Sequence, residues 1–318
     1  MSDPSSAPVA RWLVIACLLA MYIVWGTTYF AAKVGLEEAD PFFLLGTRFL
    51  VAGGLLFAYL VITGHPLPTA RQWRNASLLG FLLLAVGVCS VVTSEQWLSS
   101  GSVVALISVL PLATAIWSGV FGEWPAAGEW SAIALGTVGT LVMILGRDMQ
   151  ASVLGVGLVL LGVMGWSLGT AVSRRINVPK GAMGFAAELL AGGVIVLIIS
   201  LVLGESWSLP TTGRVWWAWI YLTILGSLVA FSAYRYLVER VSPTLAATYA
   251  YVNPPVALFV GWWLGAETFS VNVLVGCPIV LAAVALHTWV QFRKSDARAP
   301  AASSPTLDIP EPASRLTK

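Results

Sequence analysis

Charged side chains are scarce in this sequence. They make up 10% of the 318 residues, whereas soluble domains carry about 25%. The formal net charge is only +2, too small to predict a basic surface for nucleic acid. The charge content therefore argues against an ordinary soluble domain and against a nucleic-acid partner.

Cysteines and cofactor motifs are also sparse. Cys17, Cys89 and Cys277 all fall within apolar runs and lack metal-ligand spacing, so we expect neither a disulfide framework nor a metal site. The sequence contains no H-E-x-x-H, no C-x-x-C and no G-x-x-x-x-G-K-[ST] phosphate loop. We therefore expect no cofactor and no process driven by ATP, which leaves protons or a counter-solute as the possible energy sources.

Long hydrophobic runs dominate what is present. Hydrophobic residues make up 58% of the chain, and the mean hydropathy is +0.85. Runs of about 20 apolar residues can cross ~30 Å of hydrocarbon as helices. The sequence predicts an all-α polytopic membrane protein with ten transmembrane helices, at residues 12–34, 42–63, 75–94, 101–121, 130–146, 153–173, 183–203, 215–237, 244–263 and 270–292.

The positions of lysine and arginine predict the orientation of these helices. With ten spans both termini share a side, and that side carries 13 basic residues against three on the other, while Arg48 lies within a span. Basic residues accumulate in cytoplasmic loops. We therefore expect the N-terminal segment 1–11 and the C-terminal tail 293–318 to be cytoplasmic. The Ala-, Pro- and Ser-rich tail is also expected to be disordered.

The two halves of the chain, 12–146 and 153–292, resemble one another weakly. At a shift of about 140 residues Trp25 meets Trp166 and Pro111 meets Pro254, and further matches keep the same order. Five spans per half is an odd number, so the second half would enter the membrane in the opposite sense. Such inverted repeats are typical of secondary transporters, whose solute site lies between the halves.

Prolines interrupt two of the apolar runs. Pro254 and Pro255 cannot donate to the carbonyls of Ala250 and Tyr251, so they are expected to bend the ninth span. Pro111 is expected to bend the fourth span at the equivalent position. Unsatisfied carbonyls in a membrane are tolerated beside protein or a water-filled cavity, so the bends predict a central cavity. The alternative is that the prolines only shape helix packing.

Two long stretches of the sequence resemble a known family. WGTTYFAAKVGLEEADPFFLLGTRFLVAGGLL (25–56) is similar to the opening repeat of the EamA-type drug/metabolite transporter superfamily, and SPTLAATYAYVNPPVALFVGWWLGAE (242–267) to the closing part of its second repeat. The resemblance covers residues 12–292. It implies two EamA repeats, a bacterial inner-membrane location and export of small metabolites. It does not indicate the substrate, because the superfamily handles amino acids, sugars, nucleotide sugars, purines and amphipathic toxicants.

Aromatic and amide side chains are the candidates for substrate binding. Trp25 and Tyr29 share one face of the first span, and Trp166 is the repeat counterpart of Trp25. Tyr249 and Asn253 lie one turn apart beside Pro254. Aromatic faces with polar tips suit flat or partly apolar solutes. The alternative interpretation of these residues is core packing.

Polar and ionisable residues in or beside the spans are candidates for gating or proton coupling. Arg48 and Glu188 lie in the second and seventh spans, and Glu95 and Gln96 lie at the outer end of the third. Charges in a membrane are costly and often functional. The alternatives are that Arg48 and Glu188 only anchor their helices near an interface, and that Glu95 and Gln96 are solvated loop residues.

Two functions from other classes compete with transport. Residues 165–169 read G-W-S-L-G, which matches the G-x-S-x-G motif of serine hydrolases, with His287 as the one histidine in a predicted span. That motif requires a strand-to-helix elbow, whereas this one lies in a predicted helix. A membrane scaffold or receptor would explain the helices but not the inverted repeat. The sequence leaves the oligomeric state open.

Overall fold

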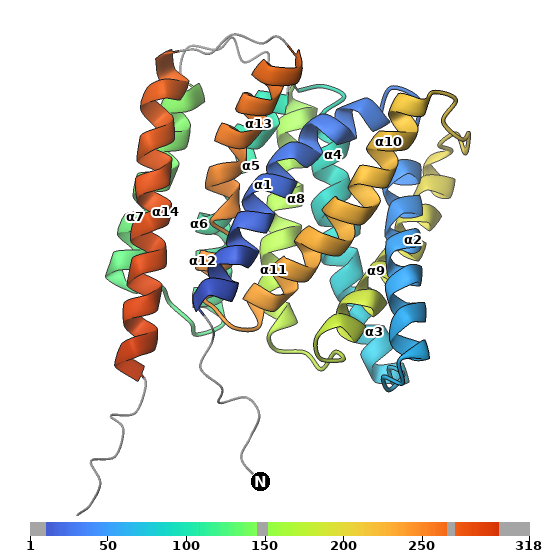
Figure 1. Ribbon diagram of the computed structural model, residues 1–318, viewed down its shortest axis with the longest axis horizontal. Coiled ribbons are helices and arrows are strands. Elements are labelled where there is room, and N and C mark those ends of the chain that lie inside the picture. Colours follow the sequence, from blue (N-terminus) through green and yellow to red (C-terminus); the bar gives the residue numbers. More distant parts are fainter. Residues whose placement is uncertain (1–10, 99, 108, 145–151, 266–270, 299–318) are drawn as a thin grey trace, which may run out of the picture.

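The computed structural model describes residues 11–98, 100–107, 109–144, 152–265 and 271–298. Every regular element in these ranges is a helix, so the predicted all-α class is confirmed (Figure 1). The helices are α1 (Arg11–Gly35), α2 (Pro41–Ile62), α3 (Ala70–Leu79), η2 (Gly80–Cys89), α4 (Ser90–Ser94), α5 (Ser100–Ile107), α6 (Leu110–Val120), α7 (Ala127–Ile144), α8 (Val153–Ser173), α9 (Ala182–Leu203), α10 (Gly213–Tyr221), η3 (Leu222–Ala230), α11 (Phe231–Val238), α12 (Pro243–Ala246), α13 (Tyr249–Gly265) and α14 (Val271–Arg298).

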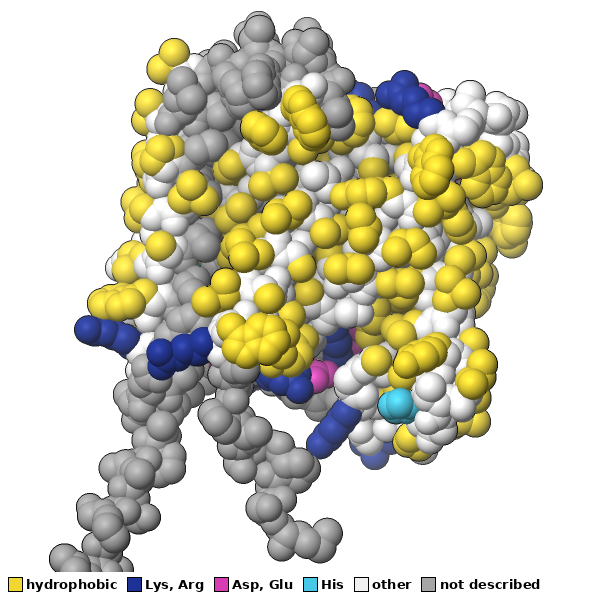
Figure 2. All heavy atoms as spheres, viewed as in Figure 1, with side chains coloured by type: hydrophobic (Ala, Val, Ile, Leu, Met, Phe, Trp, Pro, Cys, Tyr) yellow, Lys and Arg dark blue, Asp and Glu magenta, His cyan; other side chains and the backbone are white. Residues whose placement is uncertain are grey.

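Six helical segments are long and apolar enough to cross a membrane: Arg11–Gly35, Pro41–Ile62, Ala70–Ser94, Val153–Ser173, Ala182–Leu203 and Gly213–Val238. These six coincide with six of the ten predicted runs, and a shorter apolar helix, Leu110–Val120, coincides with part of a seventh. In Figure 2 hydrophobic side chains cover the middle of the visible face, while most of the lysines and arginines gather towards its two ends. That distribution suits a bilayer around the middle of the molecule.

Two of the long helical segments contain a π-helical stretch, which the sequence did not predict. In the segment Ala70–Ser94 the stretch is η2, and in Gly213–Val238 it is η3. The two stretches begin about 140 residues apart, the same shift that relates the two halves of the sequence. π-Helical turns are rare and often lie at functional sites.

The proline-bearing runs are interrupted, but not where the prolines predicted. α5 ends at Ile107 and α6 begins at Leu110, so Pro111 lies in the first turn of a new helix rather than bending a continuous one. Proline suits that position because an N–H in the first turn has no helical partner. Pro254 and Pro255 lie inside α13, and the interruption comes earlier, between α12 and α13.

Helices of the first half of the chain pack against helices of the second half. The most extensive contacts join α2 with α9 and α7 with α14, and α1 packs along α13. In Figure 1 α7 and α14 run side by side at one edge of the molecule. The closest approach is between η2 and α9, where a Cβ added to Gly80 would lie 2.7 Å from the Cα of Gly192. Gly165 and Gly169 of α8 are also tightly packed, with Val86 and Leu83 against them.

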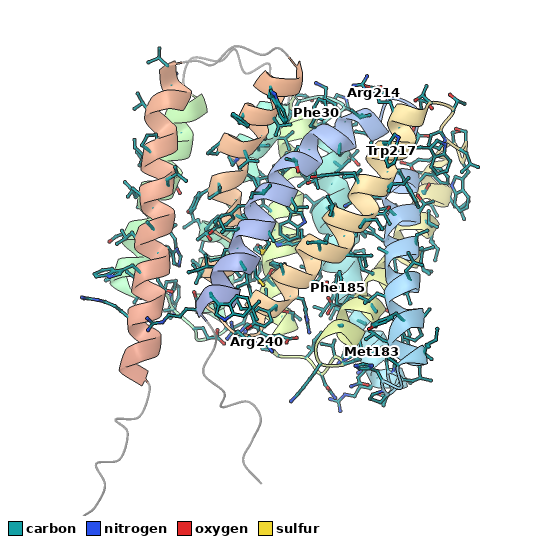
Figure 3. All side chains as sticks on the ribbon, in the orientation of Figure 1. Phe30, Met183, Phe185, Arg214, Trp217 and Arg240 are labelled. Carbon is teal, nitrogen blue, oxygen red and sulfur yellow. The ribbon has the colours of Figure 1, made fainter. Side chains whose placement is uncertain are left out.

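The two ends of the helix bundle are distinguished in Figure 3. Phe30, Arg214 and Trp217 lie towards one end, whereas Arg240 and Met183 lie towards the other. The first residues of α1 and the last turns of α14 lie at the Arg240 end (Figure 1). We call these the Arg214 end and the Arg240 end.

Candidate functional site

A cavity lies in the centre of the bundle, between helices of both halves. It contains about 730 Å³ of space not occupied by protein atoms, part of it open to the surroundings. Its lining comprises Trp25, Thr28, Tyr29, Ala32, Arg48, Gly87, Val88, Val91, Val92, Ile107, Leu110, Gly162, Val163, Trp166, Gly226, Phe231, Tyr249 and Asn253. All five residues predicted to bind substrate, together with Arg48, are therefore brought to one cavity.

Trp25 is the centre of an aromatic cluster on one wall of this cavity. Its ring centroid lies 5.5 Å from that of Trp166, 5.2 Å from Phe231, 5.5 Å from Tyr234 and 4.6 Å from Tyr249. Most of these contacts are edge-to-face or tilted, as expected for aromatic pairs. The contact between Trp25 and its repeat counterpart Trp166 places one residue from each half at the centre of the molecule.

The irregular helical stretches meet this cluster and the cavity. The Trp25 indole Nε1 donates to the carbonyl of Gly226, in η3, at 3.2 Å. Gly87, in η2, lines the cavity, and a Cβ there would lie 3.2 Å from Trp166 Cε3. Backbone irregularity at membrane depth is tolerated where it lines a cavity, and here both π-helical stretches do so.

Asn253 is fully buried in the cavity wall, yet its amide is unsatisfied. Among the described residues neither its Nδ2 nor its Oδ1 makes a hydrogen bond, although the Tyr29 hydroxyl lies close enough to interact with it. A buried amide without a partner costs roughly 1–3 kcal/mol. Asn253 therefore has a donor and an acceptor available for a molecule in the cavity.

Arg48 also lines the cavity. Its side chain is 5% exposed, and its guanidinium lies 4.8 Å from the centroid of the Phe49 ring. The buried Nε makes no hydrogen bond, and within the described part of the chain no acidic side chain forms an ion pair with it. Arg48 is thus a buried cation that faces the cavity without a counter-charge.

Glu188, the repeat counterpart of Arg48, lies outside the cavity in a buried ion pair. Its carboxylate is 3.1 Å from Nη1 of Arg235, and the Arg235 Nε is 3.0 Å from Glu239. Arg235 lies near the end of the predicted span 215–237, and only 7% of the residue is exposed. The pair joins α9 to α11 towards the Arg240 end.

Glu95 and Gln96 follow α4 in the turn at the Arg214 end. Both carboxylate oxygens of Glu95 are buried and lack hydrogen-bond partners among the described residues. Burial raises the pKa of Glu95 to about 8, against a smaller opposing effect of Lys33. The side chain of Gln96 is exposed. Neither Glu95 nor Gln96 is part of the cavity lining. Glu95 does, however, interact electrostatically with Tyr29, and Tyr29 lines the cavity.

The hydrolase alternative loses its nucleophile in this structure. Ser167 lies in the middle of α8, fully buried, and its hydroxyl donates to the carbonyls of Val163 at 2.7 Å and Met164 at 3.2 Å. The nucleophile elbow that the motif requires is absent there. His287 is instead 3.8 Å from Glu129, between α14 and α7.

Direct contacts close the bundle on the Arg240 side of the aromatic cluster. The Tyr22 hydroxyl is 2.8 Å from that of Thr248, and Tyr234 is hydrogen-bonded to Thr170. The first bond joins α1, in the first half, to the turn before α13, in the second half. The second bond joins α8 to α11, both in the second half. Farther towards that end, Arg175 donates to the carbonyl of Phe121 at 2.9 Å.

The sequence missed part of the site. Phe231 and Tyr234 complete the aromatic cluster, but they lie in an apolar run with no proline or repeat match to single them out. Gly226 accepts the Trp25 hydrogen bond only because the helix is irregular there. A helical wheel of the eighth span would have placed Phe231 and Tyr234 on one face at a spacing of three.

The class of protein follows from these observations. Apolar helices of membrane-crossing length surround a central cavity with buried polar groups, which is the arrangement expected of a secondary transporter. The sequence profile of the EamA-like transporter family matches residues 11–145 and again residues 153–289. The chain belongs to this family.

Two of the relatives of this chain are named as transporters. The chain is 40% identical over 272 residues to the uncharacterized inner membrane transporter YedA of Escherichia coli (strain K12), covering 85% of this chain and 89% of YedA. It is 22% identical over 284 residues to the uncharacterized transporter YoaV of Bacillus subtilis (strain 168), covering 87% and 97%. A crystal structure with 18% identity has a TM-score of 0.73 over 90% of this chain and 99% of the other, so the two share a fold.

Proposed function

We propose that the protein is a secondary transporter that exports small metabolites or amphipathic compounds across the bacterial inner membrane. The observation that carries this proposal is the cavity between the two halves, in which the Asn253 amide and the Arg48 Nε are buried without a hydrogen bond to any other described residue. A scaffold gains nothing from such unsatisfied groups, whereas a protein that binds a solute satisfies them with it.

In this proposal the chain has ten spans in two inverted repeats, residues 12–146 and 153–292, with both termini cytoplasmic. Three observations support it: the π-helical stretches at equivalent positions, the two interrupted spans, and the contacts between counterpart helices α2 and α9. Near-equivalent halves can exchange conformations about a central site, which is how alternating access operates.

The lining residues also suggest which state the structure represents. The lining residues of α1 lie in the C-terminal part of that helix, and Arg48 lies in the N-terminal part of α2. Both of these parts are nearer to the Arg214 end. On the opposite side the Tyr22–Thr248 contact and the Glu188–Arg235 ion pair close the bundle. With the Arg240 end in the cytoplasm, this arrangement is an outward-directed state.

Counterflow in proteoliposomes tests the proposal. A thermal-shift screen of the purified protein first selects a solute, because a ligand that binds the folded state raises its apparent stability. Vesicles loaded with unlabelled solute should then transiently accumulate the labelled solute from outside. Absence of accumulation with a solute that binds would favour a scaffold or receptor.

The same assay addresses energy coupling, for which Glu95 is our proposed proton acceptor. Its buried carboxylate lacks a partner, whereas that of Glu188 is neutralised by Arg235. Transport driven by an imposed pH gradient should be lost in Glu95→Gln but retained in Glu188→Gln. A wild-type rate indifferent to the gradient would leave exchange or facilitated diffusion.

A further inference from the structure

The charge distribution of the cavity indicates the chemistry of the solute, and this inference rests on the proposed transport function. Of the described residues that line the cavity, Arg48 is the one with a charged side chain. No aspartate or glutamate is present in this lining to balance it. A solute that binds here therefore meets one positive charge and no negative one.

A buried guanidinium without a counter-charge is energetically unfavourable. Arginine stays protonated in proteins, so it cannot relieve the cost by losing its proton. The charge can instead be stabilised by a bound anion or by water. The Phe49 ring, whose centroid lies 4.8 Å from the guanidinium, offers only a weak cation–π contact. A carboxylate fits the guanidinium best, because its two oxygens match the planar fork of donors.

The rest of the lining suits an apolar body with one further polar contact. Trp25, Trp166 and Tyr249 provide aromatic surface, and valines of η2 and α4 provide further apolar surface. Asn253 provides a free amide donor and acceptor. The polar groups therefore lie on few residues of a mostly apolar pocket, which is the arrangement that fixes the orientation of a small ligand.

We propose that the central cavity binds organic monoanions, with a carboxylate on Arg48, the Asn253 amide beside the solute, and an apolar or aromatic body against the Trp25 cluster. A positive charge on the solute is not required, since no acidic side chain of the described lining would receive it. The site thus favours simple carboxylic acids over amines and over zwitterions of the same shape.

The test is equilibrium binding to the purified protein in detergent, which requires no transport. The probes are three bodies, phenylethyl, isobutyl and naphthylmethyl, each presented as the carboxylate, the primary amide, the amine and the α-amino acid. At least one carboxylate should bind, and its amide should bind at least about tenfold more weakly, as expected for the loss of a charged hydrogen bond. The amine should bind more weakly still, and the amino acid should bind more weakly than the carboxylate.

Variants of Arg48 locate the effect. Arg48→Gln should abolish the preference for carboxylate over amide, and Arg48→Lys, which keeps the charge, should retain part of it. Arg240→Gln removes an arginine outside the cavity, at the surface near one end of the bundle. It should change neither the affinity for the carboxylate nor the affinity for its amide. If Arg48→Gln does not fold, the probe series on the wild-type chain still decides the proposal.

Three results would overturn the proposal: no carboxylate binds, acid and amide bind equally, or folded Arg48→Gln keeps the preference. These results differ from a failure of the transport function. A protein that binds carboxylates but shows no counterflow would retain the anion site and lose the proposed transport.

Discussion

At the scale of single residues, the structure distinguishes paired from unpaired charges in the apolar runs, which the sequence could identify only as charges in an unusual place. Arg48 and Glu188 occupy counterpart positions, yet one faces the cavity unpaired and the other is neutralised by Arg235. Sequence identifies a charge in a hydrophobic run, but whether a partner reaches it depends on the packing of distant helices. The difference decides which of the two is available to a solute or a proton.

The raised pKa of Glu95 predicts a pH dependence of stability. Because its pKa is raised in the folded state, folding favours the protonated form, and stability is lost as pH rises from about 4.5 towards about 8. Glu95→Gln cannot ionise, so its melting temperature should fall less than that of the wild type between pH 5 and pH 9.

The control for this experiment is Gln96→Ala, which alters the neighbouring exposed side chain. It should follow the wild-type pH dependence. Parallel pH profiles for Glu95→Gln and the wild type, measured by thermal unfolding in one detergent, would show that the carboxyl ionises freely in the folded protein.

The Glu188–Arg235 ion pair predicts a non-additive effect on stability. Arg235→Met leaves the buried Glu188 carboxylate without its counter-charge, which should cost about 3–5 kcal/mol of unfolding free energy. The double variant Glu188→Leu/Arg235→Met removes both charges and should recover part of that loss. Arg240→Met, half-exposed on the Tyr236 ring, is the matched control and should change little. A double variant as unstable as the sum of its parts would contradict this interpretation.

At the scale of helices, much of the fold could be predicted from hydropathy. The apolar runs gave the helices to within a few residues, because burial in lipid requires long uninterrupted apolar sequence. The interruptions could not be placed in this way. Pro111 marks the start of a helix rather than a bend, and the π-helical stretches contain no residue that hydropathy or proline position would single out.

The contact between η2 and α9 predicts a specific sensitivity at Gly80. A Cβ there would lie 2.7 Å from the Cα and the N of Gly192 and 2.9 Å from the carbonyl oxygen of Glu188, all backbone atoms. Gly80→Ala should therefore lower stability by roughly 1–3 kcal/mol through overpacking. Gly54→Ala, with no atom within 4 Å of the added Cβ, should be neutral or slightly stabilising. Equal thermal stability of the two variants would show that the helices do not approach this closely.

At the scale of the whole molecule, the residues that line the central cavity were easier to predict from the sequence than the contacts that enclose it. Two sequence features, the internal repeat and the paired prolines, point to these lining residues. Trp25 and Trp166 are repeat counterparts, and Tyr249 and Asn253 precede the paired prolines; all four line the cavity. The enclosure of the site was not predictable. It depends on contacts between distant segments, such as Tyr22 with Thr248.

The proposed topology predicts which end of the bundle is accessible from outside the cell. In a variant without its native cysteines, Ser208→Cys, in the exposed loop between α9 and α10, should react with an impermeant maleimide in intact spheroplasts. Lys180→Cys, exposed between α8 and α9, should react only after permeabilisation. The reverse pattern would invert the assignment of the two ends.

The central claim is that solute crosses the membrane through the cavity between the two halves, and flux through Asn253 variants tests it most directly. Counterflow of a solute selected by binding should be reduced at least about tenfold in Asn253→Ala, because the variant removes a buried amide from the cavity wall. Asn177→Ala, outside the cavity, should transport like the wild type. Unchanged, saturable flux in a correctly folded Asn253→Ala/Arg48→Gln double variant would contradict the account and place the path elsewhere.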